Sequence, residues 1–255
     1  MVMEYAENGS LRQILNNSFN SMKWDIKLEI IKRTANSLKD IHSQGLIHHD
    51  FHCGNILNIN YNYTYITDLG LFRPSNVIPS QDEYKKMYGV LPYVAPEVLI
   101  GKEYTQESNI YGFGIIAYEV CTGLPPYHDI AHDKVLAISI CNGLRPKTNY
   151  KIPQLILDII KQCWDADPLK RPKANELYDS KLKINEKFTS TSLPYNGTTL
   201  SYTTNPQAVY TSRLLDFKNL PEPKNAIDSK DNDLFEHSGN SCLVIFTKFL
   251  KCSLI

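Results

Sequence analysis

Two aspartates and an asparagine stand close together in one polar stretch of the chain: Asp50, Asn55 and Asp68. Two carboxylates and an amide oxygen form a hard, oxygen-rich set of ligands, which suits Mg²⁺ with its phosphate oxygens and waters. Phosphoryl transfer needs such a site, and it needs one carboxylate that accepts the proton of the attacking hydroxyl. On this chemistry Asp50 is the candidate base, and Asn55 and Asp68 are candidate ligands of Mg²⁺.

A short hairpin is predicted to position these three side chains. Residues 56–59 and 64–67 have the pattern of two strands, and the polar residues 60–63 between them predict a turn. The hairpin would hold Asn55, at the start of one strand, beside Asp68, at the end of the other. Asp50 would lie on the loop just before the first strand.

The motifs around these residues resemble those of the eukaryotic protein kinases. Residues 48–55 read His-His-Asp-Phe-His-Cys-Gly-Asn, like the kinase catalytic loop, and residues 68–70 read Asp-Leu-Gly, like the metal-binding Asp-Phe-Gly turn. Ala-Pro-Glu follows at 95–97, after a gap the size of an activation segment. Gly-Leu-Arg-Pro at 143–146 and Cys-Trp at 163–164 resemble the tyrosine-kinase and tyrosine-kinase-like branches. Asp-x-x-x-x-Asn alone is a weak signal, but the motifs in this order are a strong one.

The resemblance implies a function and a nucleotide site. It implies ATP and Mg²⁺ as cofactors and phosphoryl transfer to Ser, Thr or Tyr hydroxyls of proteins. The strand predicted at Met1–Tyr5 would be the hinge between two lobes, with Met3 as gatekeeper. Backbone groups of Glu4 and Ala6 would contact adenine, and Leu57 would form the floor beneath it.

Four positions depart from the family pattern: His49, His52, Val90 and Asn109. His49 replaces an Arg that pairs with phosphorylated activation segments, and His52 stands where Ser/Thr kinases carry a Lys, so the substrate class stays open. Val90 replaces a Thr. Asn109 replaces an Asp that ties down the catalytic loop, and we expect the amide to accept the same hydrogen bonds more weakly. None of the four removes the base or a metal ligand.

The Gly-rich loop, the phosphate-binding Lys and its partner Glu have no counterpart in the sequence, and they would lie upstream of Met1. We therefore expect a kinase C-lobe whose N-lobe is missing, and whether this chain alone catalyses stays open. The rival hypothesis is a non-catalytic interaction protein, a pseudokinase or truncated lobe that binds kinase partners or substrates. An in-frame Gly-rich loop and Val-Ala-x-Lys strand before Met1 would favour the enzyme.

The predicted fold class is mainly α (an α+β family fold), a kinase-like C-terminal lobe with the small hairpin. Apolar spacing predicts these helices: Leu11 to about Asn16 with Ser10 as N-cap, Trp24–His42, Ser108–Val120, Val135–Cys141 and Leu155–Trp164. The resemblance further implies a buried ion pair of Arg171 with Glu97. Residues 71–94 are polar and irregular and suit an activation segment; a long surface loop is the plainer alternative.

We expect two parts in the chain, a kinase domain at 1–183 and a tail at 184–255. The tail is rich in Ser, Thr, Asn and Tyr and lacks periodic patterns, so it is predicted to be mostly disordered. Its end, Cys252-Ser253-Leu254-Ile255, fits a prenylation box only loosely, and an apolar end from a truncated or misjoined reading frame is the preferred interpretation.

Composition narrows the partners. The chain has 255 residues, with Lys plus Arg 27 and Asp plus Glu 27, so the formal charge is zero and no global basic field favours nucleic acid. Six cysteines without a disulfide-like spacing predict reduced thiols in the cytoplasm. The longest apolar run, residues 243–246, is too short to span a membrane. A transition-metal site at His42, His48, His49 and His52 is a remote alternative to ordinary loop and helix histidines.

Overall fold

The computed structural model describes residues 6–59, 63–68, 72–74, 87–148, 152–178 and 202–225, all of which belong to one compact unit. The predicted hinge strand at Met1–Tyr5, with Met3 and Glu4, lies outside these residues. Much of the predicted activation segment and the chain end with Cys252 also lie outside them.

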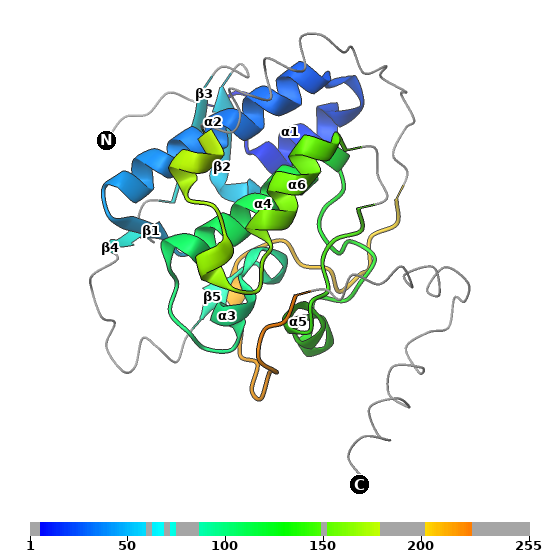
Figure 1. The fold of residues 1–255 in the computed structure, drawn as a ribbon. Helices are drawn as coiled ribbons and strands as arrows, with labels where there is room; N and C mark the ends of the chain where they lie inside the picture. The colour runs from blue at the N-terminus through cyan, green and yellow to red at the C-terminus, as the bar shows by residue number, and fades with distance from the viewer. Residues whose placement is uncertain are drawn as a thin grey trace, which may run out of the picture. The chain divides into compact units, whose positions relative to one another are not determined.

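Helix α4 (Gln106–Thr122) is the buried centre of the lobe (Figure 1). It begins at a capping box, in which Thr105 accepts from the Ser108 amide and the Ser108 hydroxyl accepts from the Thr105 amide. Every side chain from Ser108 to Thr122 is buried, because apolar residues occupy nearly all of its faces. The helix ends at Gly123, whose φ of 72° suits glycine. It extends the predicted helix by two residues at each end.

Two helices frame the hairpin on one side of α4. Helix α1 (Leu11–Ser18) begins at the predicted N-cap, Ser10, with Gln13 completing a capping box. Helix α2 (Trp24–Ser43) packs against α4 and against strand β3 (Tyr63–Ile66) (Figure 1). The chain then turns at Gly45, which has a φ of 67°. Both predicted helices are confirmed, with ends one or two residues longer.

Within the described residues, three short antiparallel strand pairs accompany the helices. Strand β2 (Ile56–Ile59) pairs with β3 in the register Ile56 to Ile66, which confirms the predicted hairpin with its second strand shifted by one residue. Strand β1 (Leu46–His48) pairs with β4 (Phe72–Pro74). Strand β5 (Tyr88–Gly89) pairs with β6 (Arg213–Leu214), which comes from far along the chain.

Further helices are α3 (Pro96–Leu99), α5 (Lys134–Cys141) and α6 (Gln154–Cys163). Gly114 lets α6 approach α4, since a Cβ there would lie 2.7 Å from the Cβ of Cys163. The last two helices confirm the predictions at 135–141 and 155–164 to within one residue. The prediction of a mainly helical lobe with a small hairpin is confirmed.

The ion pair of Arg171 with Glu97 is present and buried. Arg171 Nη1 and Nη2 donate to Glu97 Oε1 and Oε2, each at 2.7 Å, and the side chains are 0% and 5% exposed. Arg171 Nε also donates to the carbonyl of Asp165 at 2.8 Å. A buried pair satisfied in this way ties α3 to the chain after α6.

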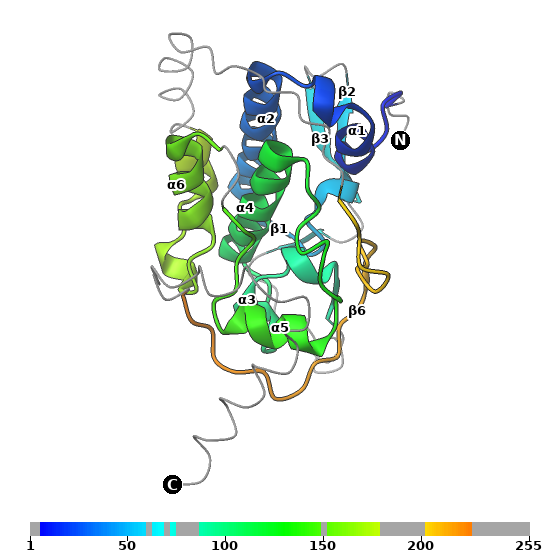
Figure 2. The same ribbon diagram turned by 90° about the vertical axis from the view of Figure 1, so that its right-hand side faces the viewer.

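The structure differs from the sequence expectation over residues 202–225. This part of the predicted disordered tail lies on the lobe as an extended segment, which runs from the neighbourhood of α1 past β5 and α5 toward the end of α6 (Figure 2). It contains only the two-residue strand β6, so it carries no periodic pattern that sequence reasoning could detect. The boundary at residue 183 stays a prediction.

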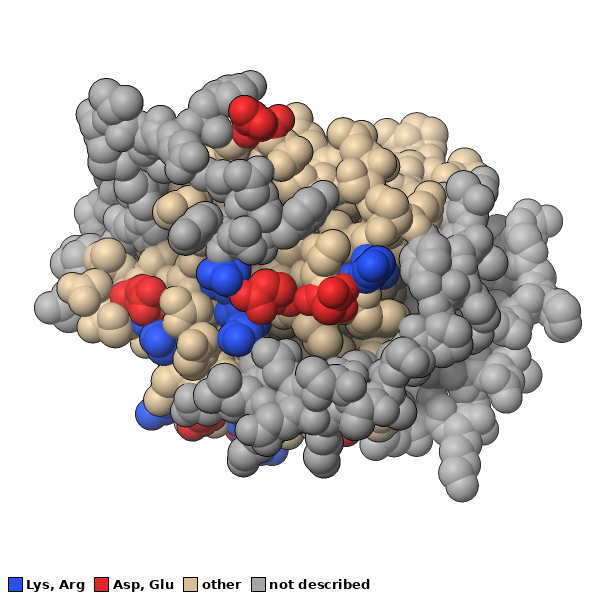
Figure 3. Space-filling model, turned by 90° about the horizontal axis from the view of Figure 1, so that it is seen from above, with Lys and Arg blue, Asp and Glu red and all other residues tan. Residues whose placement is uncertain are grey.

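The surface carries mixed charge. On the face seen in Figure 3, acidic and basic side chains lie beside one another in a short row among neutral ones. Among the described helices, none is both long enough and apolar enough to cross a membrane.

Candidate active site

Asp50 lies on the loop between β1 and β2 and is 6% exposed. Its Oδ2 lies 3.3 Å from His52 Nε2 and 3.4 Å from Asn55 Nδ2. Its Oδ1 is buried and accepts no hydrogen bond from the described residues. One oxygen is therefore held by neighbours, and the other is a buried acceptor without a hydrogen-bond partner among the described residues.

Asn55 is hydrogen-bonded to Asp50 on the loop and to Thr67, the residue before Asp68, on the hairpin. Its Nδ2 donates to the Asp50 carbonyl at 2.9 Å. The donor group of the amide is therefore already bonded, and Oδ1 is the amide atom that can bind a cation. The Thr67 amide and hydroxyl donate to the Asn55 carbonyl at 2.9 Å and 3.1 Å. Asp68 follows Thr67 directly, so the hairpin brings the three predicted residues to one end.

Asp68 has an exposed side chain and a backbone φ of 66°. Few residues other than glycine adopt this left-handed conformation, and such residues cluster at functional sites. The backbone at Asp68 therefore departs from the extended conformation of β3, which precedes it.

His52 fixes the orientation of the Asp50 carboxylate. The Gly54 amide donates to His52 Nδ1 at 3.0 Å, so the neutral ring carries its proton on Nε2, which points to Asp50 Oδ2. A Cβ on Gly54 would lie 2.6 Å from His52 Cε1, which explains why glycine stands there. At the position of the family's Lys, this chain places a hydrogen-bond donor to its own base.

Asn109, from α4, ties down the start of the loop. Its Oδ1 accepts from the His48 amide at 2.9 Å, and its Nδ2 donates to the His48 carbonyl at 2.6 Å. His42 Nε2 lies 3.3 Å from the same Oδ1. The expectation that the amide accepts the same hydrogen bonds more weakly is therefore incomplete, because the amide also supplies a donor that a carboxylate lacks.

The His48 ring is buried beneath the loop and joins it to the hairpin. Nδ1 accepts from the Asp50 amide at 3.1 Å, and Nε2 donates to the Thr67 carbonyl at 2.9 Å. Burial lowers the pKa of His48, against the opposing charges of Asp50 and Asp68. A neutral ring with its proton on Nε2 satisfies both bonds.

The other two departures lie on the wall beside Asp50. His49 packs against Tyr104, with ring centroids 4.8 Å apart, so the position of the family's Arg is used for an aromatic contact. Tyr104 donates to the Tyr88 carbonyl at 2.8 Å. Burial and the charge of Asp50 raise the pKa of Tyr104. Val90 is 1% exposed and belongs to the core.

A buried group beside the loop was not predicted from the sequence. Arg12 of α1 makes an ion pair with Glu119 of α4 and a hydrogen bond to the Tyr93 hydroxyl, which donates to Glu119 Oε2. The His52 ring lies beside Tyr93, with centroids 5.9 Å apart. Because its members are far apart in the chain, no local pattern signals this group.

The predicted nucleotide-binding residues are only partly described. The Ala6 carbonyl accepts from the Gly9 amide at 2.9 Å, which closes the turn before α1. Ser10 then forms an isolated bridge with Leu57, so the start of the described chain lies beside β2. Glu4 lies outside the described residues.

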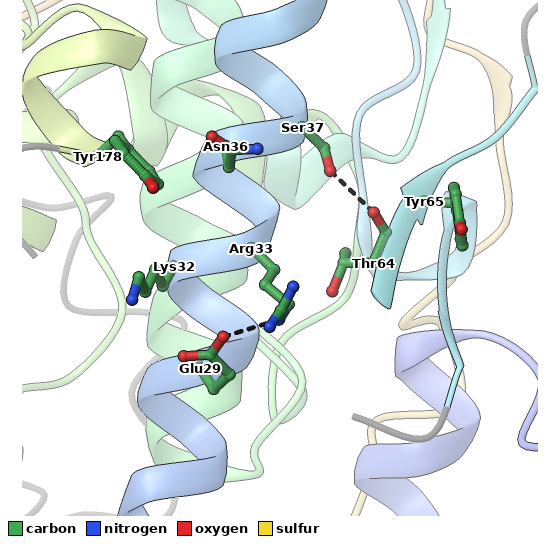
Figure 4. A pocket seen from close by; sticks show the side chains of 8 residues that line it. All are labelled: Glu29, Lys32, Arg33, Asn36, Ser37, Thr64, Tyr65 and Tyr178. Carbon is green, nitrogen blue, oxygen red and sulfur yellow. Dashed lines mark hydrogen bonds and ion pairs between the residues drawn. The ribbon is translucent and has the colours of Figure 1, made fainter. Parts of the chain in front are cut away.

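A larger pocket, of about 300 Å³, lies between α2 and β3 (Figure 4). Arg33 is paired with Glu29 at 2.7 Å, and Ser37 donates to the Thr64 carbonyl at 2.8 Å. No residue of the catalytic loop lines this pocket, whereas a much smaller hollow is lined by His48, Asp50 and Gly89. Within the described residues no group of three or more His, Cys, Asp or Glu side chains is arranged to hold a metal ion.

The helical lobe, the hairpin and the loop with Asp50 and Asn55 define the catalytic lobe of a protein kinase. The family model for protein tyrosine and serine/threonine kinases matches residues 1–180. The chain belongs to this family.

Relatives from a slime mould and a plant resemble the chain. It is 33% identical over 187 residues to the probable serine/threonine-protein kinase roco5 of Dictyostelium discoideum, a match that covers 68% of this chain and 6% of that protein. It is 31% identical over 191 residues to a probable LIM domain-containing serine/threonine-protein kinase of the same organism, covering 74% and 28%. It is 30% identical over 205 residues to the protein kinase and PP2C-like domain-containing protein of Arabidopsis thaliana, covering 68% and 31%. The chain thus spans less than a third of each of these relatives.

Proposed function

We propose that the protein to which this chain belongs transfers the γ-phosphoryl group of ATP to a hydroxyl of a protein substrate, with Asp50 as the base. The observation that supports this proposal best is that the two carboxylate oxygens of Asp50 have different surroundings. Oδ2 is held by His52 and Asn55, and Oδ1 is buried without a partner among the described residues. A substrate hydroxyl that donates to Oδ1 would meet an acceptor already fixed in orientation.

In this proposal the substrate O–H proton passes to Asp50 Oδ1 as the hydroxyl oxygen attacks phosphorus. Asn55 Oδ1 and the Asp68 carboxylate would hold Mg²⁺, and the donor set fits, since it offers hard oxygen ligands. Bound Mg²⁺ with ATP supplies the phosphoryl group and neutralises its developing charge. His48 and Asn109 act through the loop backbone, so we assign them as positioning residues.

The adenine contacts stay as predicted from the resemblance: backbone groups of Glu4 and Ala6, with Leu57 beneath the base. The bridge of Ser10 to Leu57 supports this placement, because it puts the chain after Ala6 next to β2.

We further propose Ser or Thr as the acceptor, since the relatives above are named serine/threonine-protein kinases. We also propose a cytoplasmic signalling role, since the cysteines lack a disulfide-like spacing.

Calorimetry of ATP binding with and without Mg²⁺ tests the metal and nucleotide part of this proposal. We expect Mg²⁺-dependent binding by the purified chain, and its loss in Asp68→Ala. Asp158→Ala, an exposed carboxylate on α6, is the matched control and should bind as the parent does. Absence of binding by a chain that circular dichroism shows to be folded would instead favour the non-catalytic interaction protein.

A further inference from the structure

The segment 202–225 lies against the same wall that borders Asp50. Strand β6 pairs with β5 in the register Leu214 to Tyr88 and Arg213 to Gly89, and the Leu215 amide donates to the Met87 carbonyl at 2.8 Å. Gly89 is close to the site, since a Cβ there would lie 3.9 Å from Asp50 Oδ1. The segment is therefore held by main-chain pairing next to the candidate base.

Upstream of β6 the segment is held by the loop before α5. The Asn205 amide donates to the His128 carbonyl at 2.7 Å, and the His132 amide donates to the Gln207 carbonyl at 3.1 Å. The Val209 amide donates to His132 Nδ1 at 3.1 Å. These bonds hold an extended peptide largely through its backbone, as in the addition of a strand to a sheet edge.

Tyr210, Arg213 and Leu215 anchor the middle of the segment. The Tyr210 ring covers the Arg12 guanidinium at 4.6 Å, and its hydroxyl donates to the Pro126 carbonyl at 3.0 Å. Arg213 donates to the His132 carbonyl. Leu215 is 4% exposed, whereas its neighbour Leu214 is 47% exposed. Alternate side chains therefore face the lobe and the solvent, as in a bound strand.

We propose that residues 202–225 are an intramolecular ligand of the face of the kinase lobe formed by β5 and the loop before α5, and that a protein substrate must displace them to reach Asp50. This inference rests on the function proposed above. The partner that fits the face is an extended segment with an aromatic residue at the place of Tyr210, a basic one at that of Arg213 and an apolar one at that of Leu215.

The segment is built to be displaced. Leu215 is the one buried side chain among residues 202–225, and Tyr210, Phe217 and Leu220 are only partly buried against the lobe. A tethered ligand competes well even when it binds weakly, because its effective concentration can reach the millimolar range. Release of the segment therefore removes Leu215 from the core and opens the way to Asp50.

Fluorescence anisotropy with a labelled peptide of residues 202–225 tests the inference. We expect Leu215→Asp in the full chain to release the tethered segment, so that the labelled peptide binds this variant at least about tenfold more tightly than it binds the parent. Leu214→Asp makes the same chemical change at an exposed neighbour and should bind the peptide as the parent does. A labelled peptide that itself carries Leu215→Asp should bind none of them.

Tyr210→Ala is the second variant, because it removes the contacts with Arg12 and Pro126 without burying a charge. It should also bind the labelled peptide more tightly than the parent, with circular dichroism showing that it is folded. Equal binding by the parent and the folded variants would overturn the inference. The assay contains neither ATP nor Mg²⁺, so failure of phosphoryl transfer would leave its result intact.

Discussion

The two oxygens of Asp50 have different surroundings, and this asymmetry underlies the chemistry that we propose. His52 Nε2 and Asn55 Nδ2 contact Oδ2, while Oδ1 faces the wall formed by Gly89 and Tyr104. The sequence identified Asp50 and Asn55 through their spacing. It did not identify the role of His52, because that role depends on the fold of the loop, which turns the ring back onto the Gly54 amide.

Gly54→Ala tests this arrangement. The added Cβ would clash with the His52 ring, so we expect a loss of roughly 1–3 kcal/mol in the free energy of unfolding, measured with urea. In the background of His52→Ala the ring is absent, and the same substitution should cost much less. Equal costs in the two backgrounds would show that the ring and the glycine are not coupled.

Three histidines that are buried or partly buried predict a dependence of stability on pH. Burial lowers the pKa values of His42, His48 and His132 below their ordinary 6.5. Below that pH the unfolded chain binds protons that the folded chain does not, so the free energy of unfolding should fall as the pH is lowered below 6.5 and should be recovered above it. Urea unfolding at acidic and at neutral pH measures this.

His42→Gln is the informative variant, because an amide can still donate to Asn109 but does not titrate in this range. We expect a weaker dependence on pH than in the parent. A parent that is equally stable in acidic and neutral solution would contradict the assignment of neutral buried rings.

At the scale of elements, α4 positions the loop that carries the base. Asn109 both accepts from and donates to the backbone of His48, so the helix and loop are joined by a two-way contact. The helix and its burial were predictable from apolar residues on every face. The direction of the two bonds was not, since sequence reasoning took the amide for a weaker carboxylate.

Asn109→Asp separates these interpretations. A carboxylate would restore the residue typical of the family, yet it would face the His48 carbonyl without a proton to donate. We expect the variant to lose roughly 1–3 kcal/mol in the free energy of unfolding by urea. Asn142→Asp, at an exposed position after α5, is the control. A gain in stability for Asn109→Asp would contradict the donor role.

Only some of the strand pairs could be predicted from the sequence. The hairpin of β2 and β3 was predictable, because two apolar runs flank a local polar turn. The pairing of β5 with β6 was not, because two-residue strands carry no pattern and their partner is distant in the chain. Similarly, residues 202–225 look disordered by composition, although a few spaced anchors such as Tyr210 and Leu215 hold them.

At the scale of the whole lobe, the ion pair of Arg171 with Glu97 links the region after α6 to α3. Arg171→Met leaves the Glu97 carboxylate buried without its partner, and we expect a loss of roughly 3–5 kcal/mol in the free energy of unfolding. Lys147→Met removes one partner of an exposed pair with Asp129 and should cost about 1 kcal/mol or less. Similar costs for the two variants would mean that the buried pair is not a structural link.

The most direct test of the account is phosphoryl transfer by Asp50→Asn. Transfer of labelled phosphate from ATP to Ser, Thr and Tyr peptides would be measured on the full-length protein in the presence of Mg²⁺. We predict that the parent transfers phosphate and that the variant loses about 10²–10⁴-fold in kcat, with ATP binding retained. Transfer by the variant at the parent's rate would contradict the role of Asp50, and no transfer by a folded, ATP-binding parent would contradict the proposed function.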